Sequence, residues 1–571
     1  MNKVRIVLIV VVALFILLGL GLFNLQIIQG GRNRELSNKN CIRLIPQLGS
    51  RGIIFDRAGT PIVNSRISYD VMVATLNSQE TDKVLAEVAR VLNSDFKAIK
   101  AAFKKNFLSP SLPVVVARNI DLKKAIALEE EEIDFPQITV HPRPVRNYPY
   151  NSLGAHFIGY LNEIDRWRLT RLEDYGYKTK DIVGFGGVEE KYDYYLRQEE
   201  GGLSVEVDHR GRISRTLGFE PGTNGKDIQL TIDLKIQKLA DKALAGRKGC
   251  VVIMDPNSGE IIAMSSAPAF NPEAFVEKNN TLVASYFTNS GAPLINRAIS
   301  GVYPAGSIFK MIIATAALEN KKINLSTTFV CTGKMPVGRR EFKCWSTHGP
   351  ENLIQGIAHS CDVFFYHTGL LVGPEEIRNY ALKFGLARPT GFELANESSG
   401  FIPSPMWRKV NKFKNWFDGD TANLSIGQGD VLVTPLQMTR MIAVFANKGY
   451  LVTPYIVKSI DGKDVSRARK KSVKLNFKPA TIENICVGLR GVITDTEGTG
   501  NVLFTLPVEV AGKTGSAQAP PGLAHGWFVG YFPFKEPKYA ICVFLEHGGA
   551  GYYSCVVAKE IIDGMSKEGL I

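Results

Sequence analysis

The chain has 571 residues, of which 45% are hydrophobic and 22% charged, so it has the composition of a folded protein and is too long for a single core. We expect two or three domains. Lys and Arg outnumber Asp and Glu by 68 to 55, which gives a formal net charge of +13. Because the basic residues are scattered, apart from a surface strand or loop at 467–478, we expect an anionic membrane surface or acidic polymer and no nucleic-acid partner.

Residues 6–23 form an uncharged apolar run, preceded by Lys3 and Arg5. Eighteen such residues, extendable to Ile28, are enough to cross a bilayer. The positive flank predicts a cytoplasmic N-terminus and an extracytoplasmic remainder. A cleaved signal peptide is the alternative, but no small-x-small cleavage pattern follows the apolar core. We therefore expect residues 1–28 to be an uncleaved, single-pass anchor in the cytoplasmic membrane.

Residues 29–229 contain structural patterns but no catalytic cluster that we recognise. Residues 51–59 fit a hairpin, and apolar residues recur at helical spacing between Thr81 and Phe107. The acidic cluster at 129–132 is better explained as a solvated helix end than as a catalytic pair. We interpret His156 as a buried structural histidine.

From Leu230 onwards the pattern changes to that of a larger α/β domain, residues 230–571. Residues 250–264 predict two strands joined by a turn, and a long helical middle follows. Strands at 527–531 and 539–545 and a last helix at 556–565 complete the order. This order favours a sheet with a helical cluster on one face.

Ser307 and Lys310 lie three positions apart where the turn of Pro304 and Gly306 opens an apolar, Ala-rich helix. That spacing puts the hydroxyl and the amine on one face, about a turn apart. The hydroxyl also lies among free backbone N–H groups, which is the layout of a serine acyl-transferase. Taken alone, a capping Ser with an exposed Lys is the better explanation of the pair, because Ser-x-x-Lys occurs by chance in most long chains.

Two further motifs favour the catalytic interpretation of Ser307 and Lys310. Ser360-Cys361-Asp362 lies 53 residues after Ser307, and Lys513-Thr514-Gly515-Ser516 follows an apolar stretch near the end. Ser-x-x-Lys, Ser-x-Asn and Lys-Thr-Gly, in this order, form the set of penicillin-binding proteins and class A β-lactamases. Here the middle motif ends in Asp362 instead of Asn.

On these three motifs the chain resembles the class B penicillin-binding proteins. The resemblance implies a β-lactamase-like transpeptidase domain, an α+β non-catalytic pedestal over residues 29–229, and peptidoglycan D,D-transpeptidase activity on stem peptides. It also implies inhibition by β-lactams and no cofactor for catalysis. Elongation-type members resemble this sequence in having Asp at the position of Asp362, whereas division-type members usually have Asn there.

The resemblance assigns roles to the first two motifs. Ser307 attacks the carbonyl of a D-Ala-D-Ala peptide and forms an acyl-enzyme. Lys310 is the favoured general base, which requires a neutral amine for part of the time, and burial near the charge of Lys513 favours this. Ser360 relays a proton towards the leaving amine. A carboxylate at Asp362 would instead favour the protonated amine, so the way in which the base is activated stays open.

The third motif is expected to hold the substrate. Lys513 and Thr514 bind its terminal carboxylate, and Gly515 lets the substrate backbone lie alongside the strand. By the same resemblance, the backbone N–H groups of Ser307 and Ser516 are the oxyanion donors.

Three alternatives share these motifs. A class A β-lactamase needs a Glu to activate water, and Glu393 is the candidate for that role. However, residues 390–400 match an ordinary transpeptidase loop. A D,D-carboxypeptidase would pass the acyl group to water, although the pedestal and anchor favour an amine acceptor. A non-catalytic penicillin-binding scaffold is the third.

Since the match to the pedestal leaves no room for a glycosyltransferase domain, we expect a membrane glycosyltransferase as partner.

Four candidate metal ligands fall within 31 residues: Cys331, Cys344, His348 and Cys361. The short Cys344-x3-His348 spacing lets two ligands reach one metal, and three Cys with one His suit tetrahedral zinc. The resemblance agrees, because elongation-type members carry a metal site at matching positions. The sequence therefore predicts one structural Zn²⁺. The alternatives are a Cys331–Cys344 disulfide or buried free thiols. No pairing is assigned to the remaining cysteines, which are Cys41, Cys250, Cys486, Cys542 and Cys555.

Overall fold

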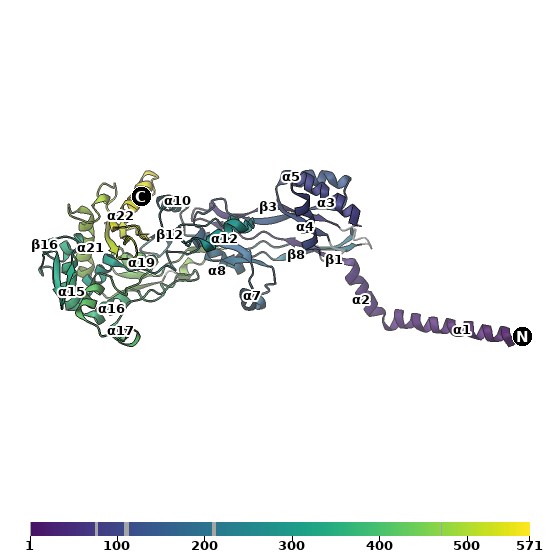
Figure 1. The fold of residues 1–571 in the computed structure, drawn as a ribbon, viewed down its shortest axis with the longest axis horizontal. Helices are drawn as coiled ribbons and strands as arrows, with labels where there is room; N and C mark the ends of the chain where they lie inside the picture. The colour runs from purple at the N-terminus through teal and green to yellow at the C-terminus, as the bar shows by residue number, and fades with distance from the viewer. Residues whose placement is uncertain (1, 75–77, 108–112, 208–212, 470) are drawn as a thin grey trace. The chain divides into compact units, whose positions relative to one another are not determined.

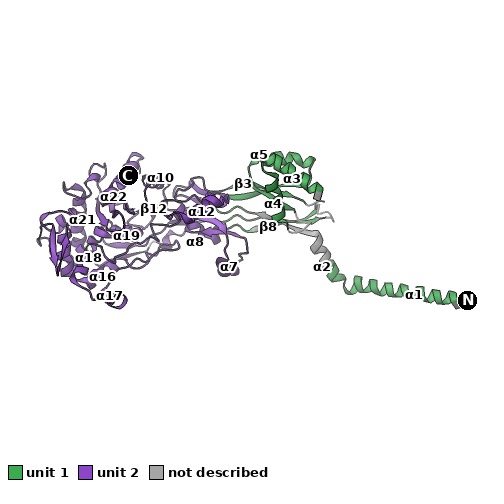
Figure 2. Ribbon diagram, in the orientation of Figure 1, with its two compact units in different colours: residues 1–52, 65–145, 197–225 green, residues 53–64, 146–196, 226–571 purple. Residues whose placement is uncertain are grey.

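The computed structural model describes the whole chain except residues 1, 75–77, 108–112, 208–212 and 470 (Figure 1). Two compact units are present (Figure 2). Unit 1 contains residues 1–52, 65–145 and 197–225, and unit 2 contains residues 53–64, 146–196 and 226–571. We describe each unit by itself.

Unit 1 begins with a long apolar helix, α1 (Asn2–Phe23), which continues as η1 (Asn24–Ile28) and is followed by α2 (Gly30–Cys41). Its apolar side chains are exposed, with Phe15 and Leu17 about 70% accessible. Residues 3–28 are long and apolar enough to cross a membrane, the one such segment in the described part of the chain. The helix is thus a candidate membrane anchor.

The rest of unit 1 is α+β. β8 (Glu200–Val207) pairs antiparallel with both β1 (Ile42–Leu48) and β9 (Ile213–Glu220). β3 (Pro61–Val73), whose first residues belong to unit 2, pairs with β4 (Val114–Ile120) and β5 (Ile138–Asn147). Helices α3 (Ser78–Leu92), α4 (Phe96–Asn106) and α5 (Leu122–Glu130) share a core that includes Val71, Leu85, Val88, Ile99 and Leu128.

The residues at helical spacing between 81 and 107 form two helices, α3 and α4. Asn93 adopts a left-handed conformation, φ 53°, and ends α3. Asp95 then caps α4, its carboxylate accepting a hydrogen bond from the Lys97 N–H. The acidic residues 129–132 lie at the end of α5 and in η2 (Glu131–Ile133), mostly exposed, as predicted for a solvated helix end.

Unit 2 is built on a five-stranded antiparallel sheet in the order β12-β11-β23-β22-β21. The strands are β11 (Gly249–Met254), β12 (Ile261–Ala267), β21 (Ala511–Ala517), β22 (His525–Phe532) and β23 (Tyr539–Leu545). Every residue of β11 and β22 is buried, which explains why these strands read as continuous apolar runs. The predicted 250–264 hairpin is confirmed.

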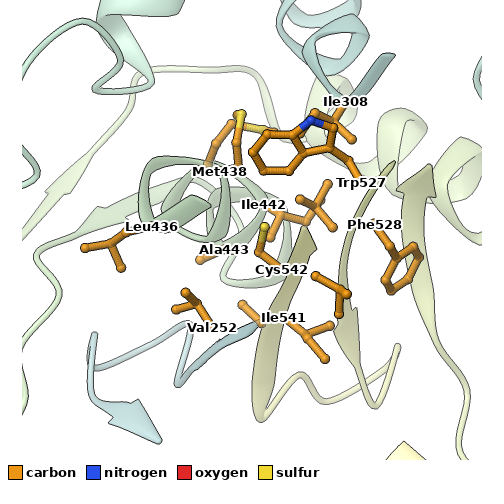
Figure 3. Packing of buried hydrophobic residues seen from close by; sticks show 14 of the residues in the cluster. Val252, Ile308, Leu436, Met438, Ile442, Ala443, Trp527, Phe528, Ile541 and Cys542 are labelled. Atoms are coloured by element: carbon orange, nitrogen blue, oxygen red, sulfur yellow. The ribbon is translucent and has the colours of Figure 1, made fainter. Parts of the chain in front are cut away.

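Helices cover this sheet. α10 (Leu234–Ala243) and α22 (Gly551–Lys567) pack against each other and against the strands, while α19 (Pro435–Ala446), buried along its whole length, packs on β11, β22 and β23. Figure 3 shows this core, with Leu436, Ile442 and Ala443 of α19 beside Val252 of β11 and Cys542 of β23. One part of the core of unit 2 therefore lies between α19 and the sheet.

The helical middle of unit 2 carries the first two motifs. Its members are η4 (Gly306–Phe309), α13 (Lys310–Glu319), α14 (Leu353–Ala358), α15 (Asp362–Val372), α16 (Pro374–Lys383), α17 (Pro405–Lys412), α18 (Asp418–Ser425) and α21 (Pro479–Thr494). Two small hairpin-like pairs lie between α13 and α14: β13 (Phe329–Cys331) with β16 (Gly349–Glu351), and β14 (Lys334–Val337) with β15 (Arg340–Lys343).

Residues 146–196 of unit 2 form a small lobe of α6 (Ala155–Ile158), β6 (Tyr160–Glu163), α7 (Arg166–Leu172), β7 (Ile182–Phe185), α8 (Gly187–Lys191) and α9 (Asp193–Leu196). His156 is buried here, and its Nε2 lies 2.7 Å from the carbonyl oxygen of Pro293. The structural role predicted for it is confirmed. Burial is the main cause that lowers the pKa of His156 to about 4.

His156 should make the fold sensitive to acid. Its pKa is depressed in the folded state, so the unfolded chain binds more protons between about pH 6.5 and pH 4, and stability falls as the pH drops through that window. The loss is at most about 3 kcal/mol. We expect His156→Gln to be less stable than the parent at pH 7.5 but to lose less stability between pH 7 and pH 4.5, measured by denaturant unfolding. Equal pH slopes for the two proteins would contradict this role.

Candidate active site

The first motif is held in a tight turn against the sheet. The Trp527 indole N–H donates to the carbonyl of Pro304 at 3.0 Å, and the Gly306 N–H donates to that of Gly427 at 2.9 Å. Gly306 has φ +60°, and a Cβ there would lie 2.9 Å from the carbonyl oxygen of Ser516, so the turn needs a glycine. Ser307 follows in η4, half-buried.

Lys310 begins α13 one turn after Ser307 and is fully buried. Its ammonium donates to the carbonyl of Ser360 at 2.7 Å, to the Ser360 hydroxyl at 3.2 Å and to Asp362 Oδ1 at 2.7 Å. The Asp362 side chain is 15% exposed, so this ion pair is largely screened from water. The structure thus joins the first two motifs through one amine.

Ser360 connects α14 to α15 with an unusual backbone, φ 55° in a residue other than glycine. This left-handed link aims the carbonyl and the hydroxyl of Ser360 at the same ammonium. Backbone strain concentrated at such a position is typical of a functional site.

The third motif lies on β21. Lys513 is fully buried, and its ammonium donates to the carbonyl of Thr514 at 3.1 Å. Burial, and secondly the charge of Lys310, hold the pKa of Lys513 well below its usual range. A Cβ at Gly515 would lie 3.2 Å from the Ile308 side chain and 3.3 Å from the carbonyl of Ala305, so β21 runs close beside the Ser307 turn.

Ser516 is the exposed residue of β21, and two contacts hold it. Its hydroxyl accepts a hydrogen bond from the Gly551 N–H at 3.0 Å, and its carbonyl accepts one from Gln428 Nε2 at 3.3 Å. No site role for Gln428 or Gly551 was predicted from the sequence. Two glycines are the local signals: close contacts exclude a side chain at Gly427, which lies against Gly306, and at Gly551, which lies against Gly515.

The four predicted metal ligands come together. The sulfur atoms of Cys331, Cys344 and Cys361 and a ring nitrogen of His348 all lie within 4.8 Å of one another. His348 Nδ1 lies 3.5 Å from Cys331 Sγ and 3.6 Å from Cys344 Sγ. Three thiols and an imidazole around one point are a donor set that suits tetrahedral zinc.

This Cys/His cluster touches the second motif directly. Cys344 Sγ accepts the Asp362 N–H at 3.2 Å, and Cys361 Sγ accepts the Phe364 N–H at 3.4 Å at the start of α15. The hydrogen bond between the two thiols lowers the pKa of Cys344 and raises that of Cys361. Cys331, Cys344 and Cys361 are free thiols in this structure, so they form no Cys331–Cys344 disulfide here.

Glu393, the candidate for activating water in a β-lactamase, is already engaged. Its Oε1 accepts hydrogen bonds from the Ile456 and Val457 N–H groups at 3.0 and 2.9 Å and pairs with Arg469 at 2.6 Å. These contacts give the carboxylate a structural role and do not favour the β-lactamase alternative.

The family models divide the chain close to residue 230, where the sequence predicts the boundary between the two domains. Residues 249–566 match the penicillin-binding protein transpeptidase domain, and residues 46–230 match the penicillin-binding protein dimerisation domain. The chain is 32% identical to peptidoglycan D,D-transpeptidase MrdA of Acinetobacter baumannii over 94% of its own length and 84% of the relative.

Solved structures agree. The complex between penicillin-binding protein PBP2 and MreC from Helicobacter pylori has a TM-score of 0.82 at 26% identity, covering 93% of this chain and 99% of that one. A structure described as a peptidoglycan synthase complex that coordinates polymerisation and crosslinking has a TM-score of 0.75 at 28% identity, covering 99% and 98%. The fold and site thus define a penicillin-binding protein with transpeptidase and dimerisation domains. This chain belongs to that family, and its relatives include peptidoglycan D,D-transpeptidases named MrdA.

Proposed function

We propose that the chain is a peptidoglycan D,D-transpeptidase that works through a serine acyl-enzyme during cell elongation and is inhibited by β-lactams. The observation that carries this proposal is the buried Lys310 ammonium, one turn from Ser307 and in contact with both Ser360 and Asp362. Its transpeptidase relatives and its family model support the reaction class.

In the first half-reaction, the Ser307 oxygen attacks the penultimate D-Ala carbonyl, an ester forms, and the terminal D-Ala leaves as the amine with the proton. Lys310 accepts the Ser307 proton in its neutral form. Asp362, 2.7 Å away, holds the Lys310 side chain in place, and Ser360, at 3.2 Å, can pass the proton that Lys310 takes from Ser307 to the leaving amine. In the second half-reaction an acceptor amine attacks the ester, an amide forms, and Ser307 regains its proton.

The substrate's terminal carboxylate is bound by Lys513 and Thr514, and its backbone lies along Gly515 and Ser516. The N–H groups of Ser307 and Ser516 stabilise the oxyanion. Catalysis in this scheme needs no cofactor.

The test is the fate of the acyl group. The full-length chain in detergent is given a stem pentapeptide ending in D-Ala-D-Ala and a labelled amine-bearing stem peptide. We expect a labelled amide to form as D-Ala is released. Release of D-Ala with only the hydrolysed acid as product would favour the D,D-carboxypeptidase alternative.

We further propose that Cys331, Cys344, His348 and Cys361 hold one structural Zn²⁺. The cluster fits the metal, because His348 Nδ1 faces two sulfur atoms and all four ligand atoms lie within 4.8 Å of one another. Bound zinc would fix the backbone of the second motif; the chain's own residues carry out the chemistry.

A membrane glycosyltransferase is the proposed partner, since residues 29–229 form a non-catalytic pedestal and residues 230–571 a cross-linking domain. The solved complex that coordinates polymerisation and crosslinking supports this pairing by similarity. Residues 1–28 are the anchor, with the N-terminus in the cytoplasm because Lys3 and Arg5 precede the apolar run. Co-purification of the full chain with the polymerase tests the pairing.

A further inference from the structure

One polar contact of the third motif lies outside the three motifs. The hydroxyl oxygen of Thr499 is 2.6 Å from that of Thr514, a short distance within the normal range for an O–H···O hydrogen bond. Thr514 is only 6% exposed and Thr499 is half-buried, so water competes little for this bond.

The loop that carries Thr499 is fixed in place. It follows α21, which packs on β21. A Cβ at Gly498 would run into the carbonyl of Val492, and one at Gly500 would lie 2.9 Å from the Ile493 side chain. Because neither glycine has a side chain, the loop can lie directly against the end of α21. In this position the Thr499 side chain points at Thr514.

A hydroxyl has one hydrogen to donate and two lone pairs to accept with. If Thr514 donated to Thr499, it would have no hydrogen left and would present lone pairs to an anion. If Thr499 donates to Thr514, the single Thr514 hydrogen stays free for a substrate carboxylate, and the donated bond also polarises it. An incoming carboxylate selects the second arrangement.

We propose that Thr499 is a positioning residue, whose hydroxyl donates to Thr514 and so directs the Thr514 O–H at the terminal carboxylate of the donor peptide. The inference rests on the proposed carboxylate-binding role of Thr514. Thr499 itself does not touch the substrate; it sets the direction of the hydroxyl that does.

The test compares two acyl donors on the full-length chain in detergent: a D-alanyl thioester ending in a carboxylate and the same thioester ending in a carboxamide. Thr499→Val keeps the side-chain shape and removes the hydroxyl. We expect its kcat/KM for the carboxylate donor to fall about tenfold, mainly through KM, and that for the carboxamide donor to change less than about twofold. Thr499→Ser, which keeps the hydroxyl, should restore the carboxylate preference.

Thr494→Val is the matched control, because the Thr494 hydroxyl bonds only to the carbonyl of Arg490 within α21 and is exposed. Equal losses for both donors in Thr499→Val, or an unchanged carboxylate preference, would overturn the inference. A parent chain that is acylated at Ser307 but does not prefer the carboxylate donor would also overturn the inference, and this result would leave the proposed serine mechanism intact. Absence of acylation at Ser307 in the parent would instead refute the proposed function.

Discussion

Lys310→Met is expected to slow acylation by β-lactam by at least about a thousandfold, since it removes the proposed general base and leaves Ser307 in place. The methionine side chain is similar in length, so the turn that positions Ser307 should survive. The variant also leaves Asp362 without its ion-pair partner in a largely buried place, which should lower the unfolding free energy by about 3 kcal/mol. Rates of acylation and denaturant unfolding measure the two effects.

The double variant Lys310→Met/Asp362→Asn separates chemistry from stability. Neutralising Asp362 removes the unpaired carboxylate, so we expect stability to recover while acylation stays slow. Lys321→Met, at an exposed position just past the end of α13, is the control for a lysine removed elsewhere. Recovery of acylation in the double variant would show that Lys310 acts only through the fold and would remove it as the base.

The second large effect is expected from the Cys/His cluster. Cys344→Ser should abolish stoichiometric zinc, lower Tm by roughly 5–10 °C and slow acylation at least about tenfold. The reason is local: Cys344 Sγ accepts the Asp362 N–H, so the cluster supports the backbone that presents Ser360 and Asp362 to Lys310. Elemental analysis of protein purified without chelator, thermal unfolding and acylation rates are the measurements.

Cys486→Ser is the matched control, because Cys486 is also half-buried but lies outside the cluster, with its sulfur near the carbonyl of Phe445. It should retain zinc and acylation. A parent protein without zinc, or with a Cys331–Cys344 disulfide in its peptide map, would end the metal proposal.

The three motifs were predictable because each is local: Ser307 and Lys310 are one turn apart, and Lys513 to Ser516 follow one another on β21. Their meeting was inferred from the family resemblance, and the contacts of Lys310 with Ser360 and Asp362 agree with it. The Cys/His cluster was predictable because its four members fall within 31 residues of the sequence.

The residues around these motifs were not predictable. Thr499 reaches Thr514 only because α21 packs on β21, and Gly551 reaches Ser516 only because α22 begins beside that strand. Such approaches depend on tertiary packing, which local spacing does not encode. The helical spacing over 81–107 does not show the break between α3 and α4 for a related reason, since Asn93 and Asp95 end and restart the helix while the apolar periodicity continues.

Mass spectrometry of the full-length chain after incubation with a penicillin tests the central claim most directly, because it reports which atom is acylated. We predict one adduct of the drug's mass per chain, located by peptide mapping on Ser307, and none in Ser307→Ala with an unchanged Tm. An unmodified Ser307 in folded protein, or an adduct on another residue, would contradict the account.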